Sequence, residues 1–581
     1  MAGHFAGGAG LAVATQPNEV GCGGGSGYSG MDVASPRDGS STTETATTHA
    51  DYDLLPYPSM PIVHTQPAHL AALGALFGLA APAADRARVL EFGCAAGGNI
   101  IPLAARFPAA SFLGIDLSQR HVADGRNYIA ALGLDNVRLQ QADLTTLDLG
   151  GEQFDYIICH GVFSWVPKAA QDAIFRLCQE ALMPNGIATI SYNVLPGWHL
   201  RTAIRELCLR YAGKDGSPQR RVARARAALE QIAAASNQTE PYGMLLQTEA
   251  RRLKGVPAAY ILGEFLAPDN APCYVQDFIE RAAAHKLDYL CEADLFAAVP
   301  PALDATIRNR ITAFADSNRS AAEQDIDFLT GRLFRRSVLV RSRPAGAPPP
   351  MPDPNRLQSL HVSCPLRPDA ANSAEGTTVF TDDKSRPVSI RDPVVGQAIS
   401  RLAAVYPGTL CLDDLIRDSD PAARVQLAER IRQAVFILVM AGRADISVLP
   451  LRVGQGDEKW PTAWPLARAE AASRQAWITS LRHTGVPAVA VLKVLLPCLD
   501  GSRDHLALVA ILIDALRSGA VPMPEATDRR DGVSADSVEI IADRFLRQTL
   551  EYLHHHALLL PDARPPNGHS KVSDLDGKIL M

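Results

Sequence analysis

The sequence predicts an α/β fold in its first half, interrupted by a helical insertion and followed by a mainly helical C-terminal domain. Two observations predict the α/β half. From residue 52 to residue 193, short apolar runs alternate with helical patterns, which is typical of βαβ units and a parallel sheet. The first apolar run carries Glu91 near its end and continues into small residues, as the first strand and turn of nucleotide-binding domains do.

Length and composition narrow the class of protein. A chain of 581 residues is too long to fold around a single hydrophobic core, so we expect two or three domains. A net charge of -6 gives no support for general affinity toward nucleic acid or membranes. The ten cysteines form no CxxC pair, so we expect a reducing cytoplasm, no disulfide framework and no metal site. No apolar run approaches the ~20 residues that span a bilayer, so we expect no membrane insertion. The N-terminus lacks a basic region followed by an apolar segment, so we expect no secretory signal.

Composition along the chain predicts six segments. Residues 1–50 are rich in Gly, Ser and Thr, which predicts a disordered tail, and a dense run of prolines predicts an extended linker over residues 343–356. The other segments are expected as an α/β core over residues 51–200, a helical insertion with the last sheet strands over 201–342, a C-terminal winged-helix-like interaction domain over 357–560, and a tail over 561–581.

The elements of the sheet follow in order. Strands are expected at residues 88–92, 111–115, 137–141, 154–159 and 186–192. Helices are expected at residues 99–107, 118–132 and 169–182. After the helical stretch, the sheet is expected to end with strands at residues 287–290 and 333–341. Because the carboxyl ends of parallel strands meet at one edge, we expect the ligand crevice there.

The clearest element of the C-terminal domain is a helix from His505 to Leu516. Gly501 breaks the chain before this helix, and Asp500 or Ser502 is expected to cap its first turn. Short helices joined by tight turns predict the winged-helix-like fold of this domain.

The turn after the first strand favours a particular ligand. Small residues from Gly93 to Gly97 let the backbone approach a ligand closely, because larger side chains would collide with it. Glu91 stands where dinucleotide-binding proteins carry a glycine fingerprint for pyrophosphate. Its carboxylate suits the ammonium group of a methionine moiety, so the motif favours S-adenosylmethionine (SAM) over a dinucleotide.

Further motifs stand at the ends of the next strands. Asp116 ends the second strand, Asp143 and Leu144 follow the third, and the fourth runs into His160. In this order the motifs resemble the class I SAM-dependent methyltransferases, with Ala95 in place of the usual middle glycine. The resemblance implies a Rossmann-like methyltransferase sheet and SAM as the cofactor.

The resemblance also implies roles for single residues. Asp116 would accept hydrogen bonds from the ribose hydroxyls, Asp143 would accept one from the adenine amino group, and Leu144 would flank the ring. The cofactor-binding residues expected are Glu91, Gly93, Cys94, Ala95, Gly97, Asn99, Asp116, Leu117, Asp143, Leu144 and His160. Helix capping is the alternative interpretation of Asp116, and turn capping that of Asp143.

Candidate acceptor-side residues follow the fourth and fifth strands. Phe163, Trp165 and Trp198 predict a substrate pocket whose ring faces attract a cation, with plain core packing as the alternative. His160 and Tyr192 are the candidate catalytic proton acceptors, and a structural role is the alternative for His160. A basic series lies at Arg201, Arg205, Arg210, Lys214, Arg220, Arg221, Arg224 and Arg226. We interpret this series as a solvated helix face or as a site for an acidic substrate.

Longer phrases are similar to one group within the methyltransferases. They are Tyr52-Asp53 with Pro56-Tyr57, Leu76 to Leu79, Gly93 to Asn99, His160 to Val166, Ser191 to Asn193 with Pro196 to His199, Asp327-Phe328-Leu329, and Phe334-Arg335. These phrases resemble bacterial methyltransferases with a methyltransferase regulatory domain, a group that includes enzymes methylating lysines of surface proteins. The resemblance implies a protein substrate, with lysine as the preferred acceptor, and a winged-helix-like C-terminal part.

Three functions stay open on sequence alone. The first is a SAM-dependent methyltransferase acting on protein lysine. The second is a small-molecule O- or N-methyltransferase with the helical insertion as a lid, and the third is a non-catalytic SAM sensor. Nucleic acid is not expected as a partner, because the C-terminal domain has no dense stripe of Lys and Arg. A homodimer is compatible with the sequence, which does not specify the assembly.

Overall fold

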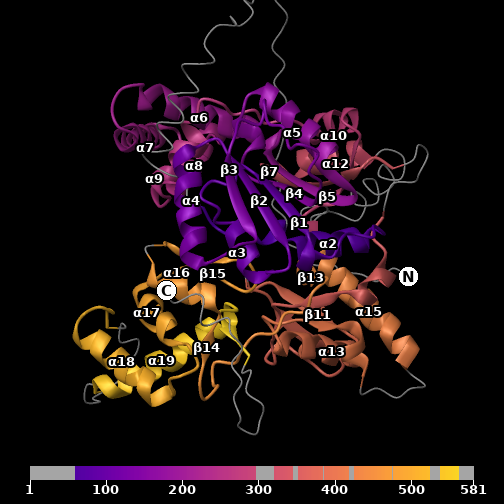
Figure 1. The fold of residues 1–581 in the computed structure, drawn as a ribbon, viewed down its shortest axis with the longest axis vertical. Helices are drawn as coiled ribbons and strands as arrows, with labels where there is room; N and C mark the ends of the chain where they lie inside the picture. The colour runs from indigo at the N-terminus through magenta and orange to yellow at the C-terminus, as the bar shows by residue number, and fades with distance from the viewer. Residues whose placement is uncertain are drawn as a thin grey trace, which may run out of the picture. The chain divides into compact units, whose positions relative to one another are not determined.

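A seven-stranded mixed sheet forms the centre of the N-terminal half, with strand order β3-β2-β1-β4-β5-β7-β6 (Figure 1). Its strands are β1 Arg88–Phe92, β2 Ser111–Asp116, β3 Val137–Gln141, β4 Phe154–Cys159, β5 Leu182–Asn193, β6 Leu287–Glu292 and β7 Phe334–Arg341. β1 to β5 pair in parallel, whereas β7 runs antiparallel to β5 and to β6. The predicted α/β class is therefore confirmed, and the two late strands complete the sheet.

The computed structural model describes residues 59–295, 319–343, 351–383, 385–417, 424–473, 475–523 and 537–561. The tail expected over residues 1–50, all but the first residue of the tail expected over 561–581, and part of the proline-rich linker lie outside these ranges. Within them, no helix combines the length and the apolar character needed to cross a bilayer.

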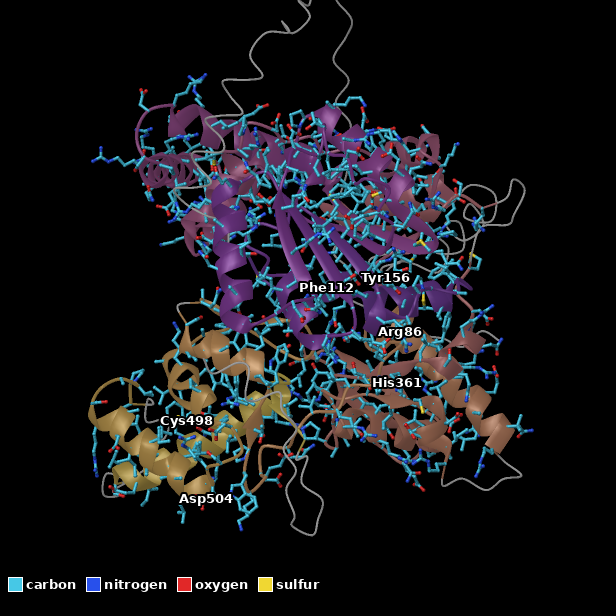
Figure 2. The ribbon with its side chains drawn as sticks, viewed as in Figure 1. Arg86, Phe112, Tyr156, His361, Cys498 and Asp504 are labelled. Carbon is cyan, nitrogen blue, oxygen red and sulfur yellow. The ribbon has the colours of Figure 1, made fainter. Side chains whose placement is uncertain are left out.

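Helices cover both faces of the sheet because strand side chains alternate between faces. One face packs on α2 Pro67–Leu76, α3 Ile100–Arg106 and α4 Gln119–Leu132. Phe112 and Tyr156 belong to this face, and its core continues into the C-terminal part of the chain (Figure 2). The other face packs on α5 Lys168–Ala181 and α10 Val275–Ala284. β5 begins four residues earlier than predicted, with an irregular register against β4.

The insertion between β5 and β6 has its own small core, which includes Ile204, Leu229 and Phe265. Its helices are α6 Gly197–Ala212, α7 Pro218–Ala235, α8 Pro241–Lys254 and α9 Ala258–Phe265, and α12 Arg319–Thr330 precedes β7. Arg224 Nε donates to Ala212 O at 2.7 Å, and Arg226 Nη2 donates to Val256 O at 2.8 Å. These two members of the predicted basic series therefore hold the insertion together.

The C-terminal half contains more strand than predicted. Its first part holds η5 Pro354–Ser359, β8 His361–Ser363, β9 Arg367–Pro368, β10 Thr378–Thr381, β11 Pro387–Ile390, α13 Pro393–Ala404, β12 Leu410–Cys411, α14 Leu412–Ile416, α15 Arg424–Met440 and β13 Asp445–Ser447. Its second part holds β14 Thr462–Ala463, α16 Pro465–Ala472, β15 Trp477–Thr479, β16 Gly485–Pro487, α17 Ala490–Leu495, η6 Leu496–Cys498, α18 His505–Arg517, α19 Val538–His555 and β17 Leu559–Leu560.

The N-cap of α18 differs from the prediction. Asp504 caps this helix, since its carboxylate accepts a hydrogen bond from Ala507 N at 3.0 Å. Ser502 instead bonds to Asp500 within the preceding turn. Asp504 is the cap because it directly precedes the helix, and a capping side chain must reach the N–H groups of the first helical turn.

Candidate active site

The predicted motifs meet at the carboxyl edge of β1 to β4. Gly93 N and Cys94 N donate to Ile115 O of β2 at 2.7 and 3.1 Å. Ala142 N, after β3, donates to Asp116 O at 3.0 Å. The strand order reverses between β1 and β4, because the chain passes outward to β2 and β3 before it returns to the other side of β1. Ligands of open α/β sheets bind at such a reversal.

The turn after β1 requires backbone angles that favour glycine. Gly93 has a φ of 68° and Gly97 a φ of 82°. A Cβ on Gly93 would lie 2.2 Å from Val162 Cγ2. Ala95 also has a positive φ, of 48°, although its Cβ makes this conformation costly. The Ala95 N–H donates to Asp116 Oδ2 at 2.8 Å, which holds the turn in place.

Glu91 is the buried acid of this edge, with 4% of its surface exposed. Its Oε1 accepts a 2.8 Å hydrogen bond from Asn99 Nδ2. Its Oε2 is buried and has no hydrogen-bond partner among the described residues. Burial, with a smaller contribution from Asp116, raises the pKa of Glu91 to about 8. The unpaired, buried Oε2 of Glu91 can accept a hydrogen bond from the ammonium group of SAM. Asn99 bonds to the other oxygen and holds the carboxylate in place.

Asp116 and Asp143 lie on the neighbouring strand ends. Asp116 Oδ1 accepts a 2.9 Å hydrogen bond from Ser118 N, and both of its oxygens keep lone pairs for ribose hydroxyls. Asp143 Oδ1 accepts from both the N–H and the hydroxyl of Thr145 at 2.8 Å, so it also stabilises its turn. Leu117 is 41% exposed beside this edge, and Leu144 packs on the sheet. Ser118, and not Asp116, caps α4, since its hydroxyl accepts from His121 N at 3.1 Å, whereas turn capping by Asp143 is compatible with its cofactor role.

His160 follows β4 and lies beside two residues of β7: Phe334, which the sequence named only within a family-like phrase, and Arg336, which it did not name. Its ring meets Phe334 of β7 edge to face, with centroids 5.9 Å apart. Burial, then the charge of Arg336, then His64 lower the pKa of His160 to about 3. The imidazole is therefore neutral at physiological pH. Such a low pKa makes it a weak base, which disfavours the predicted role as proton acceptor.

The predicted aromatic residues divide into core and edge. Phe163 and Trp198 are completely buried, and Trp165 is half-buried and meets Trp198 at 5.9 Å. Tyr192 stacks on Phe278 with ring centroids 3.9 Å apart. Its hydroxyl lies 2.9 Å from Ser337 Oγ in a buried hydrogen bond, and burial raises its pKa well above the usual range. This position favours packing for Tyr192 over proton transfer.

A buried ion cluster lies next to Tyr192; the sequence named its members Asp327 and Arg335 within family-like phrases but did not predict that they form an ion cluster. Arg335 of β7 is completely buried, and its guanidinium contacts Glu292, Glu323 and Asp327 at 2.8 to 3.0 Å. Ser337 Oγ donates to Glu292 Oε1 at 2.9 Å, which joins the cluster to Tyr192. The Arg335 charge holds the pKa of Glu292 below its usual value. The cluster fixes β6, β7 and α12 beside the site.

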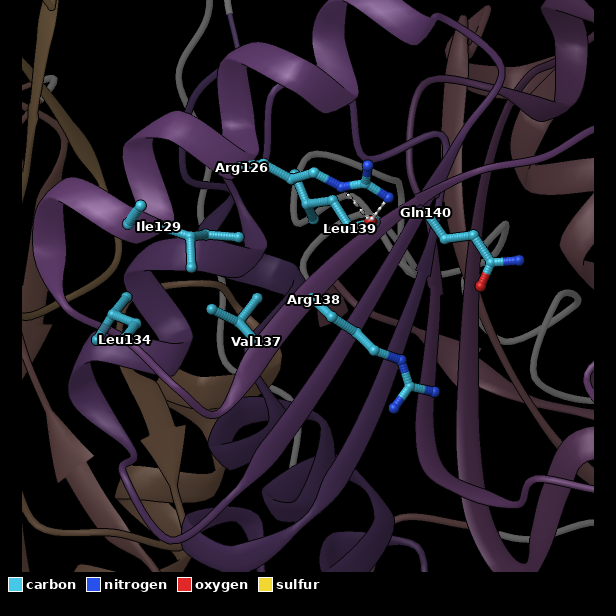
Figure 3. A pocket seen from close by; sticks show the side chains of 8 residues that line it. Arg126, Ile129, Leu134, Val137, Arg138, Leu139 and Gln140 are labelled. Carbon is cyan, nitrogen blue, oxygen red and sulfur yellow. Dashed lines mark hydrogen bonds between the residues drawn. The ribbon is translucent and has the colours of Figure 1, made fainter.

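A hollow on the outer edge of the sheet contains none of the predicted site residues (Figure 3). It lies between α4 and β3, and Arg126 donates to Leu139 O across it at 2.8 and 3.0 Å. Its lining residues come from the flank of the sheet, so we do not assign it to cofactor or acceptor.

Three family matches cover successive parts of the chain. A methyltransferase domain matches residues 89–186, a predicted methyltransferase regulatory domain matches residues 257–341, and the PKMT C-terminal winged helix domain matches residues 459–558. The fold and this edge of the sheet thus define a SAM-dependent methyltransferase.

Relatives and solved structures are also similar to this chain. Two uncharacterised proteins of Rickettsia prowazekii are similar: RP789 is 29% identical over 86% of this chain and 91% of its own length, and RP028 is 37% identical over 41% of this chain and 95% of its own length. The structure of PKMT2 from Rickettsia typhi matches with a TM-score of 0.76 and 25% identity, over 87% of this chain and 100% of that one. The same protein in complex with AdoHcy matches with a TM-score of 0.77 and 24% identity, over the same shares of the two chains. The chain belongs to the family of class I methyltransferases that carry the regulatory domain and the PKMT winged helix domain.

Proposed function

We propose that this methyltransferase transfers the methyl group of SAM to lysine side chains of a protein substrate. The PKMT winged helix domain at residues 459–558 is the observation that carries this proposal, since PKMT stands for protein-lysine methyltransferase. The likeness to PKMT2 also extends over 87% of the chain. The match to a trans-aconitate 2-methyltransferase of Methylobacterium nodulans covers only 24% of it. A small-molecule acceptor is therefore the weaker alternative.

Three acids would hold the cofactor. Glu91 would bind the ammonium group through its orphaned Oε2, Asp116 the ribose hydroxyls, and Asp143 the adenine amino group. When bound, SAM supplies a methyl group activated by a sulfonium. The chain contributes alignment, because an in-line displacement is fast only when the acceptor and the methyl carbon are held in line.

The acceptor amine must lose a proton before it attacks, and a free lysine has a pKa of about 10.4. We place the amine near His160, Phe334 and Arg336, at the carboxyl edge beside β4 and β7. The positive charge of Arg336 and the partly buried rings both favour a neutral amine there. His160 lines this site as an uncharged imidazole and takes no part in proton transfer. The proton of the acceptor amine is released to water.

Label transfer tests the proposal. Radiolabelled SAM is incubated with the enzyme and a lysate that is separated into protein and small-molecule fractions, with Asp116→Ala as the inactive control. Label in discrete protein bands that depends on Asp116 supports a protein acceptor, and label in small molecules alone contradicts it. We place the reaction in the cytoplasm, which the nine free cysteines of the described residues support.

A further inference from the structure

A hairpin of the winged-helix part reaches the cofactor motif. β15 and β16 are joined by residues 480–484, and Gln66 Nε2 donates to Arg482 O of this turn at 3.0 Å. Arg106 of α3 also bonds to Leu481 O. Turns of this kind are usually exposed, yet the side chain of His483 at its tip is only 2% exposed.

The hydrogen bonds of Asn99 assign its amide atoms. The backbone N–H of Ile62 lies 2.9 Å from Oδ1, and a backbone N–H can only donate, so this atom is the oxygen. The amide NH₂ therefore faces Glu91 Oε1. His483 Nε2 lies 2.8 Å from the same Oδ1 and must donate its hydrogen. Burial, with Arg106 adding to it, lowers the pKa of His483 to about 3, which agrees with a neutral ring.

We infer that His483 of the winged-helix part is a positioning residue for SAM, acting through Asn99 on Glu91. Asn99 Oδ1 accepts from Ile62, Thr65 and His483, and its NH₂ then points at Glu91 Oε1. If the Asn99 amide were rotated by half a turn, its oxygen would face Glu91 Oε1 and the hydrogen bond between them would be lost. The hairpin therefore reinforces, together with Ile62, the orientation of the Asn99 amide that holds Glu91 Oε1 and leaves Oε2 for the cofactor. Cofactor binding thus depends on a docked C-terminal domain, whichever acceptor is methylated.

Two amide substitutions separate positioning from folding. His483 has a φ of 59°, which Asn tolerates better than most residues. His483→Asn preserves the turn but is too short to reach Asn99, whereas His483→Gln places its amide nitrogen near the original Nε2. In the full-length chain, we expect SAM affinity to fall about 10-fold in His483→Asn and to stay within about 3-fold in His483→Gln. If His483 only stabilised the turn, His483→Asn would keep a higher SAM affinity than His483→Gln, because Asn tolerates the positive φ better.

Calorimetric titration with SAM measures both variants, and thermal unfolding shows that they fold. Tyr128→Phe is the matched control: it removes the 3.3 Å hydrogen bond from Tyr128 to Glu470 between the same two regions, without touching Asn99. We expect its SAM affinity to be unchanged within about 2-fold. Wild-type affinity in His483→Asn, or an equal loss in Tyr128→Phe, would overturn the inference. Titration needs no acceptor, so wild-type SAM binding without lysine methylation would refute only the proposed function.

Discussion

Ala95 N donates a 2.8 Å hydrogen bond to Asp116 Oδ2, so the acid expected to bind ribose also holds the turn that we expect to contact the cofactor. Ser118 N donates to the other oxygen of the same carboxylate at 2.9 Å. The end of β2 therefore has two tasks, and a substitution there affects binding and local structure together.

This double role predicts a graded effect of two substitutions. Asp116→Ala removes both acceptors, so we expect at least about a 10-fold loss of SAM affinity and a lower melting temperature. Asp116→Asn keeps one acceptor oxygen, so its melting temperature should lie nearer wild type while affinity is still lost. Calorimetry and thermal unfolding measure the two effects. Equal melting temperatures for the two variants would contradict the structural task.

The raised pKa of Glu91 predicts that SAM binding depends on pH. Below a pKa of about 8 the free protein holds Glu91 protonated, and binding an ammonium group requires the carboxylate. SAM affinity should therefore increase from pH 6 to pH 8 and then level off, by up to about 10-fold per pH unit. At pH 7, titrations in buffers of different ionisation enthalpy should reveal proton release. Glu91→Gln should bind weakly and without this slope; the same slope in that variant would assign it to another group.

The raised pKa of Glu91 also affects folding stability, which should decrease as pH rises, whereas SAM affinity should increase. The pKa of Glu91 is higher in the folded protein than its usual 4.5, so the folded state binds this proton more tightly. Its contribution is fully present below pH 4.5 and is lost as pH rises through about 8. Without SAM, Glu91→Gln should therefore gain in melting temperature over wild type as pH is raised from 6 to 8. A constant difference across this range would contradict the shift.

Gly93 and Gly161 separate backbone strain from steric conflict. Both residues have a positive φ. A Cβ added to Gly93 would lie 2.2 Å from Val162 Cγ2, whereas a Cβ added to Gly161 would have no atom within 4 Å. Gly161→Ala should cost about 1–2 kcal/mol of stability from strain alone. Gly93→Ala should cost more and weaken SAM binding, because Val162 must move. Denaturant unfolding compares them, and equal losses would show that strain decides both.

The cluster around Arg335 predicts a large loss of stability. Arg335→Met leaves Glu292, Glu323 and Asp327 without their buried cation, so we expect about 3–5 kcal/mol of destabilisation. Arg138→Met is the control, since it breaks an exposed pair with Glu152 and should cost about 0–1 kcal/mol. Denaturant unfolding gives both values. A similar cost for the two variants would mean that the cluster is not a folding determinant.

The sequence predicted the part of the site that lies within single βα units. Glu91, Asp116 and Asp143 each stand directly after or within a strand whose apolar pattern is local, so their common edge follows from parallel pairing. The same logic placed His160 after β4. Asn99 was predicted as a cofactor residue, and the structure places it one step back, against Glu91.

The rest depends on contacts between distant segments. His483 meets Asn99 across 384 positions, and no local pattern marks a histidine in a short hairpin turn. Phe334 and Arg336 reach His160 only because β7 returns antiparallel beside β5 after the insertion. Tyr192 was predicted as a proton acceptor from its place near the end of β5; the structure turns it toward Phe278 and the core.

Blocking the lysines of the acceptor proteins tests whether lysine receives the methyl group. A lysate is divided, and the amines of one half are acetylated before incubation with enzyme and radiolabelled SAM. We expect strong protein labelling in the untreated half, little in the acetylated half, and methyl-lysine in digests of the labelled bands. Undiminished labelling after acetylation would contradict lysine as the acceptor.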